Sequence, residues 1–97
     1  MPAYAVFIRE KTRNAAKIAE YKKLVPASFE KHPAKILAVN GPSEVLEGPK
    51  SEEIIILEFP SYEAAQAWYN SAEYQAAREL RYQGGDYRCI ITEGKAK

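Results

Sequence analysis

The sequence predicts a single α+β domain over residues 1–97, with four strands and two helical regions in the order strand, helix, strand, strand, helix, strand. Two observations predict this class. Short runs of β-branched and aromatic residues alternate with longer segments whose apolar residues recur every three or four positions. The apolar fraction of 46% and the charged fraction of 28% are ordinary for a globular protein, and 97 residues suffice for one small core.

The first strand and the first helix are predicted from the N-terminal third of the chain. Residues 3–10 are rich in β-branched and aromatic side chains and are followed by charged residues, as at the end of a strand. Asn14 is a good N-cap, and apolar residues follow at helical spacing through residues 18–25. Pro26 disfavours helical geometry at the residue before it, so we expect the helix to kink or restart there and to be ended by residues 32–33.

The middle of the chain predicts two further strands separated by a loop. Residues 34–39 form an apolar run, followed by a bend at residues 40–42. Extended structure is expected to resume at residues 44–47, before a glycine- and proline-containing loop at residues 48–51. Residues 53–59 are the third strand.

The second helical region is expected to consist of two helices placed end to end. Ser61 is a suitable N-cap for the first of them, and Glu63 suits the positive end of a helix dipole. Asn70 and Ser71 interrupt the pattern and cap a second segment, which Gly84 and Gly85 end. The last strand is predicted at residues 87–93.

This order of elements predicts an antiparallel sheet with both helical regions on one face, the ferredoxin-like arrangement. The third strand is apolar on both faces, because Ile54 and Ile56 point one way while Ile55, Leu57 and Phe59 point the other. Two helical regions cover only one face. We therefore expect a homodimer joined sheet to sheet, with the partner meeting the side that carries Ile55 or Leu57.

Charge and hydropathy exclude several classes of partner. Fourteen Lys and Arg against thirteen Asp and Glu give a net charge of +1 without a basic block, so no nucleic-acid partner is expected. The longest aliphatic run, residues 54–57, is far shorter than the roughly 20 residues that a membrane span requires. The N-terminal residues lack the apolar segment of a signal peptide, so we expect a cytoplasmic protein that does not bind membranes.

The cysteine and histidine content argues against a metal or another cofactor. Cys89 is the only cysteine and lies in an apolar run, which indicates a buried, unreactive thiol. One histidine offers no cluster of metal ligands, and no phosphate-binding loop is present. We expect neither a metal nor a cofactor.

Three stretches of the chain are distinctive, namely LEFPSYEAAQAWYNSAEYQAA at residues 57–77, YKKLVP at residues 21–26 and VLEG at residues 45–48. They resemble the family numbered 1330 among domains of unknown function, which belongs to the dimeric α/β-barrel superfamily. The resemblance implies a ferredoxin-like dimer. The resemblance leaves the function open, because the scaffold that it implies is shared by cofactor-independent oxygenases, isomerases, haem-handling enzymes and binding modules.

The chain departs from this family at residues 33–41. Members typically carry GGRFLARGG there, whereas this chain has PAKILAVNG. Lys35 keeps one of the two positive charges, and Val39 replaces the second. Lys35 is therefore a candidate ligand-binding residue, but an anionic ligand does not follow from the resemblance alone.

Two residues are candidates for proton transfer in a cofactor-independent enzyme. Glu58 matches the family's LEFP motif and shares a strand face with Ile54 and Ile56, where desolvation would raise the pKa of its carboxyl group. The alternative is a salt bridge to Lys35, Arg78 or Arg81. His32 follows the first helix and is either a general base or a partner of the helix dipole.

Aromatic residues around the break in the second helical region indicate either core packing or a ligand pocket between the helices and the sheet. The candidate ligand-binding residues in this region are Tyr21, Trp68, Tyr69, Asn70 and Tyr74. Three functions remain open from the sequence: an enzyme acting on a small organic molecule, a non-catalytic ligand-binding module, and a structural dimer whose aromatic residues fill the cleft.

Overall fold

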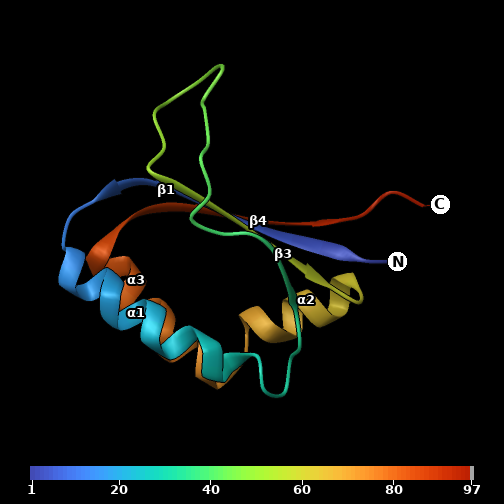
Figure 1. The fold of residues 1–97 in the computed structure, drawn as a ribbon. Coiled ribbons are helices and arrows are strands. Elements are labelled where there is room, and N and C mark those ends of the chain that lie inside the picture. The colour runs from blue at the N-terminus through green and yellow to red at the C-terminus, as the bar shows by residue number, and fades with distance from the viewer. Residues whose placement is uncertain (97) are drawn as a thin grey trace.

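The computed structural model describes residues 1–96 and shows a four-stranded antiparallel sheet with helices on one face (Figure 1). The strands run in the order β2-β3-β1-β4, and the helices are α1, α2 and α3. Their bounds are β1 Ala3–Thr12, α1 Ala15–Ser28, β2 Lys35–Ala38, β3 Glu53–Phe59, α2 Tyr62–Tyr69, α3 Ala72–Gly84 and β4 Gly85–Glu93. The predicted ferredoxin-like α+β arrangement is confirmed.

Capping side chains define where the helices begin. The Asn14 side chain accepts a hydrogen bond from the backbone N–H of Lys17 at 3.2 Å. Ser61 caps α2, and Ser71 caps α3 by accepting from the backbone N–H of Tyr74 at 3.3 Å. The predicted division of the second helical region into two helices is therefore confirmed.

Helix α1 differs from the sequence prediction at its C-terminal end. Pro26 lies inside the helix, which neither restarts there nor extends to residue 33 but ends at Ser28. Pro26 has no N–H to bond the carbonyl of Lys22, and the helix continues for only two residues beyond it. Phe29 is the C-cap, and its backbone N–H bonds to the carbonyl of Pro26.

The segment between β2 and β3 also differs from the prediction. Residues 44–47 form no strand, and residues 39–52 make a long loop that projects away from the helices (Figure 1). Strand β2 is the edge strand, its register shifts between Ile36 and Ala38, and it ends before Asn40, which has a positive φ of 56°. All of residues 39–50 are exposed, and within residues 1–96 no further strand lies beyond β2 with which residues 44–47 could pair.

The two faces of the sheet have different neighbours. Ile55, Leu57 and Phe59 of β3 lie on the helix-covered face, together with Ala3, Ala5 and Phe7 of β1. Ile54 and Ile56 lie on the opposite face, which no helix or strand within residues 1–96 covers, although the loop after β2 lines a hollow together with Ile54. The expectation that a partner meets Ile55 or Leu57 is therefore wrong, because the alternation along β3 identified two apolar faces without showing which one the helices take.

Trp68, Tyr74 and Phe59 are the largest fully buried side chains of the core. Helices α1 and α3 lie side by side beneath them (Figure 1). Gly84 permits this contact, since a Cβ there would lie 2.6 Å from Cδ1 of Ile18. Within residues 1–96, no helix is long and apolar enough to cross a bilayer.

Candidate functional site

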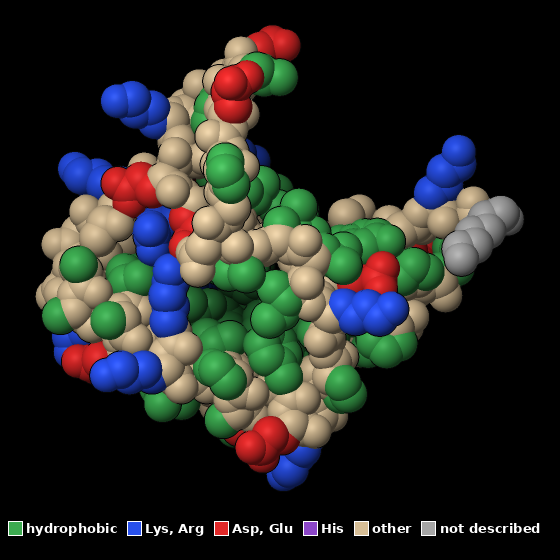
Figure 2. All heavy atoms as spheres, viewed as in Figure 1, with side chains coloured by type: hydrophobic (Ala, Val, Ile, Leu, Met, Phe, Trp, Pro, Cys, Tyr) green, Lys and Arg blue, Asp and Glu red, His purple; other side chains and the backbone are tan. Residues whose placement is uncertain are grey.

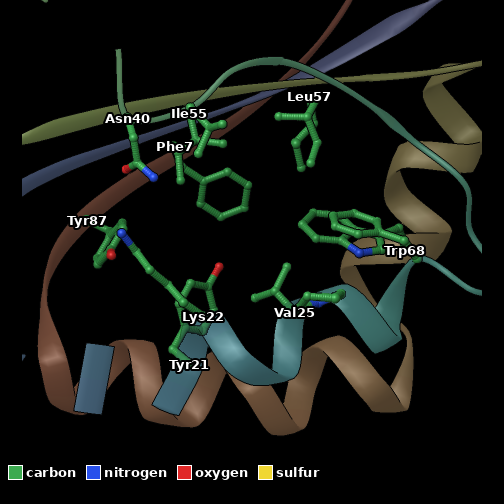
Figure 3. Close-up of a pocket in the computed structure, with 13 residues that line it drawn as sticks. Phe7, Tyr21, Lys22, Val25, Asn40, Ile55, Leu57, Trp68 and Tyr87 are labelled. Atoms are coloured by element: carbon green, nitrogen blue, oxygen red, sulfur yellow. The ribbon is translucent and has the colours of Figure 1, made fainter. Parts of the chain in front are cut away.

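A cavity of about 260 Å³ lies between α1 and the sheet. Figure 2 shows it as a hollow lined by hydrophobic side chains, and Figure 3 shows the residues that surround it. The wall is built by Phe7 of β1, Ile55 and Leu57 of β3, and Val25 and Phe29 at the end of α1. Most of the cavity is therefore apolar.

Trp68 closes one end of the cavity (Figure 3). Its indole ring stacks on Phe29, with ring centroids 5.4 Å apart and an interplanar angle of 11°. Its Nε1 donates a hydrogen bond to Oγ of Ser28 at 2.8 Å. The indole N–H thus has a partner within the core, and the flat face of the ring is held in a fixed orientation beside the cavity.

Polar side chains gather at the opposite end. Lys22 of α1, Asn40 of the loop after β2 and Tyr87 of β4 line the cavity there (Figure 3). The Tyr87 hydroxyl is buried beside Arg9, and no group within residues 1–96 accepts its proton. Burial raises the pKa of Tyr87, with hydrogen bonding to Arg9 and the positive charge of Arg9 opposing the shift, so this group is a neutral donor at pH 7.

An ion-pair network fixes Lys22 at this end. Its Nζ lies 2.8 Å from Oε2 of Glu53, a carboxylate that is only 7% exposed. Oε1 of the same carboxylate lies 3.5 Å from Nη1 of Arg9, and Nε of Arg9 lies 3.3 Å from Oε1 of Glu52. Two cations and two carboxylates therefore balance one another.

A further cation lies behind the cavity wall. Arg81 of α3 is 3% exposed, and its Cζ lies 5.5 Å from the ring centroid of Phe7 and 5.1 Å from that of Tyr87. No carboxylate within residues 1–96 lies within ion-pairing distance of it. Its charge is stabilised by aromatic faces, an arrangement that favours burial of a guanidinium.

Two of the sequence-predicted ligand-binding residues line the cavity, namely Tyr21 and Trp68. Tyr74 lies behind Tyr21, with the two hydroxyl oxygens 2.9 Å apart. Burial raises the pKa of both phenols. Tyr69 packs against Tyr74 and accepts a hydrogen bond from Arg78 at 3.3 Å, and Asn70 is the exposed C-cap of α2, so neither reaches the cavity.

The structure places the two proposed catalytic residues outside the cavity. Glu58 lies on the uncovered face of β3, opposite the helices that carry the tyrosines, and its Oε2 lies 3.9 Å from Nζ of Lys35. That pairing is the salt bridge considered as the alternative to catalysis. Lys35 is 80% exposed, and neither it nor the half-buried His32 beyond α1 lines the cavity.

Sequence reasoning missed most of the polar end of the cavity. Lys22 precedes Leu24 and Val25 on α1 and reads as a solvated lysine, while Asn40 reads as a turn residue. Only the fold brings them beside Tyr87, which comes from the far end of the chain. The one sequence signal for a polar group near this end of the cavity was Arg81, a charged residue that follows Leu80 on the buried side of α3.

No group of three or more His, Cys, Asp or Glu side chains gathers as metal ligands would within residues 1–96. Cys89 lies on the helix-covered side of β4, and burial raises the pKa of its thiol to about 11. The chemistry available at the cavity is therefore that of apolar contact plus hydrogen-bond donors.

Comparison with known proteins identifies the family. The family described as domain of unknown function (DUF1330) matches residues 2–95. The chain belongs to this family. A comparison with curated proteins finds no match.

Solved structures support the fold. The RPA0582 protein of unknown function from Rhodopseudomonas palustris is 20% identical, with 99% of this chain and 84% of that chain covered and a TM-score of 0.73. A dimeric ferredoxin-like protein of unknown function from Jannaschia sp. CCS1 is 13% identical, with 97% and 100% covered and a TM-score of 0.73. SnoaB, a cofactor-independent oxygenase from Streptomyces nogalater, is 8% identical, with 99% and 94% covered and a TM-score of 0.64. At these identities the likeness shows the fold alone.

Proposed function

We propose that this DUF1330 protein is a homodimer that binds a small, largely apolar organic molecule in the cavity between α1 and the sheet. The observation that carries the proposal is the cavity itself. The surrounding side chains Trp68, Leu57 and Phe7 are buried and packed, yet about 260 Å³ beside them stays open. The exposed side chains of Ile36 and Val39 also line this space, so it opens to solvent and a small molecule can reach the buried aromatic residues.

The size and lining of the cavity indicate the kind of ligand. Ligand pockets for drug-sized molecules begin at about 300 Å³, so this cavity suits a smaller molecule, on the scale of one ring with a short substituent. Trp68 and Phe29 offer flat apolar surfaces, and Lys22, Asn40 and Tyr87 offer polar contacts at the other end. Apolar walls with a few convergent polar groups are typical of metabolite sites.

The exposed apolar residues on the uncovered face of the sheet support the proposal of a second copy. Val6, Ile8, Ile54 and Ile56 are only partly buried there, and Ile90 is 43% exposed. A single chain leaves this apolar face in water, whereas a second copy related by a two-fold axis would cover it. Similar structures from Jannaschia sp. CCS1 and Bacteroides fragilis are described as dimeric.

Binding is proposed ahead of catalysis because of where the titratable groups lie. A cofactor-independent enzyme would need Glu58 or His32 beside the ligand to move a proton near neutral pH. Both side chains lie away from the cavity. If the enzyme hypothesis is right, Glu58→Gln or His32→Gln will abolish turnover of a bound compound, whereas a binding module will show the same ligand affinity in both variants.

The binding proposal is tested by filling the cavity. Val25 points into it from α1 (Figure 3), so Val25→Phe should occupy the space and abolish the thermal stabilisation that small aromatic compounds give to the parent protein. Leu24→Phe is the matched control, because Leu24 is the neighbouring residue of the same helix and is exposed. Equal stabilisation of parent and Val25→Phe would contradict the proposal.

A further inference from the structure

The charge around the cavity indicates which group a ligand presents. The side chains that line it include no carboxylate. Its polar contacts are the ammonium group of Lys22, the amide of Asn40 and the hydroxyls of Tyr21 and Tyr87. Lys22 can only donate, Asn40 and the tyrosines can donate as well as accept, and no lining side chain carries a negative charge.

Two of these donors have capacity to spare. Lys22 has three N–H donors and one close carboxylate partner, Oε2 of Glu53 at 2.8 Å. The Tyr87 hydroxyl has Arg9 as a neighbour, but its own proton has no acceptor within residues 1–96, which is costly unless a ligand or water accepts it. Both groups lie at the same end of the cavity (Figure 3).

The fixed charges add an uncompensated positive charge at this end. Arg9 and Lys22 are balanced by Glu52 and Glu53, whereas the buried Arg81 has no carboxylate partner within residues 1–96. Its guanidinium lies behind the rings of Phe7 and Tyr87, which form part of the cavity wall. Because charges interact more strongly through a protein interior than through water, Arg81 makes this end of the cavity attractive to an anion.

We propose that the ligand is a small apolar carboxylate, held with its carboxylate at Lys22, Asn40 and Tyr87 and with its ring or chain against Trp68 and Leu57. This inference rests on the proposed binding function and specifies its ligand class. The donors satisfy the carboxylate oxygens, and the carboxylate in turn supplies the acceptor that the Tyr87 hydroxyl lacks. Because the polar side chains lie at one end of the cavity and the apolar side chains at the other, the cavity favours a molecule with charge at one end only.

The test compares each acid with its neutral amide. Benzoate, phenylacetate and hexanoate are titrated into the parent protein beside benzamide, phenylacetamide and hexanamide, with binding followed by calorimetry. At least one acid should bind about tenfold more tightly than its amide, as expected for charge-assisted hydrogen bonds. Tyr87→Phe and Lys22→Met should each weaken binding of that acid several-fold and binding of its amide less, because the amide carbonyl also accepts from these donors but carries no charge. Lys23→Met is the matched control on the exposed side of the same helix and should change neither.

Two results would overturn the inference, and they differ in what they say of the proposed function. If an amide binds as tightly as its acid, the cavity binds small molecules without selecting a carboxylate. If neither acids nor amides bind at low millimolar concentration, and neutral aromatic compounds also fail to stabilise the protein, the proposed binding function fails with it. Tyr87→Phe preserves the size of the ring, so its melting temperature serves as the check that the variant is folded.

Discussion

Trp68 belongs at once to the core and to the cavity wall. The side chain is fully buried, its Nε1 donates to Ser28, and its ring centroid lies 4.2 Å from that of Tyr74. A second aromatic neighbour, Phe59, lies 5.3 Å away. Because it is buried against these rings, Trp68 contributes a large part of the stability of a small domain.

We predict that Trp68→Ala lowers the free energy of unfolding by about 3–5 kcal/mol, because it opens a second cavity beside the existing one. Trp68→Phe should cost less, since the ring contact with Phe29 is kept while the hydrogen bond to Ser28 is lost. Urea unfolding followed by circular dichroism measures both. A melting temperature close to that of the parent for Trp68→Ala would show that the indole is a ligand platform with no structural role.

Cys89 makes the stability of the folded protein depend on pH in the alkaline range. The thiol has an ordinary pKa of 9.0, and burial on the helix-covered side of β4 raises it to about 11 in the folded chain. The unfolded chain gives up this proton more readily than the folded chain. The contribution of the protonated thiol to the stability of the folded chain is therefore complete below pH 9 and is lost as the pH rises from about 9 to about 11. Buried Tyr21 and Tyr74, whose pKa values are also raised, act in the same direction at higher pH.

We therefore expect the urea midpoint of the parent to fall between pH 8 and pH 10.5, and to fall less in Cys89→Ala. The tyrosines remain in the variant, so the difference between the two proteins isolates the thiol. Identical pH profiles for parent and variant would contradict the assignment.

At the scale of the helices and strands, local signals decide most boundaries. Asn14, Ser61 and Ser71 are capping residues whose role depends on a few neighbouring atoms, and the structure confirms all three helix starts. The end of α1 was not predictable in the same way. Whether a helix continues through Pro26 depends on how the next residues pack, and Phe29 packs against Trp68, which lies 39 residues further along the chain.

Strand β3 shows a different limit. Its sequence alternation established that both faces are apolar, but the face that meets the helices is selected by β1, where Ala3 and Ala5 are small and fully buried. The same ambiguity misplaced Glu58. An acidic residue in an apolar strand looked like a group in a cleft, whereas it lies on the uncovered face beside Lys35.

The uncovered face carries the prediction on assembly. Light scattering at low micromolar concentration should report about twice the chain mass of 10.9 kDa, with an interface of roughly 800 Å² per partner. Ile56→Lys places an unpaired charge at the centre of this interface and should yield monomers or unfolded protein. Leu24→Lys, on the exposed surface of α1, is the control that should remain dimeric. A parent protein that is monomeric at this concentration would contradict the dimer.

For the whole molecule, the two faces of one sheet have different roles. The face beneath the helices holds the core and the cavity, and we propose that the opposite face meets a second copy. A sequence reveals the composition of both faces, but the cavity is formed by residues from β1, α1, β2 and the loop after it, β3, α2 and β4 together. The cavity could not be predicted until these elements were placed in space, although two of its lining residues, Tyr21 and Trp68, were.

Strand β3 allows the most direct test, because neighbouring residues along it report on opposite faces. With isoleucine and leucine methyl groups labelled and a small aromatic ligand bound, nuclear Overhauser effects between ligand and protein identify the occupied face. The account predicts contacts to the methyl groups of Ile55 and Leu57, which line the cavity, and none to Ile54 and Ile56. Contacts to Ile54 and Ile56 without any to Ile55 or Leu57 would contradict it.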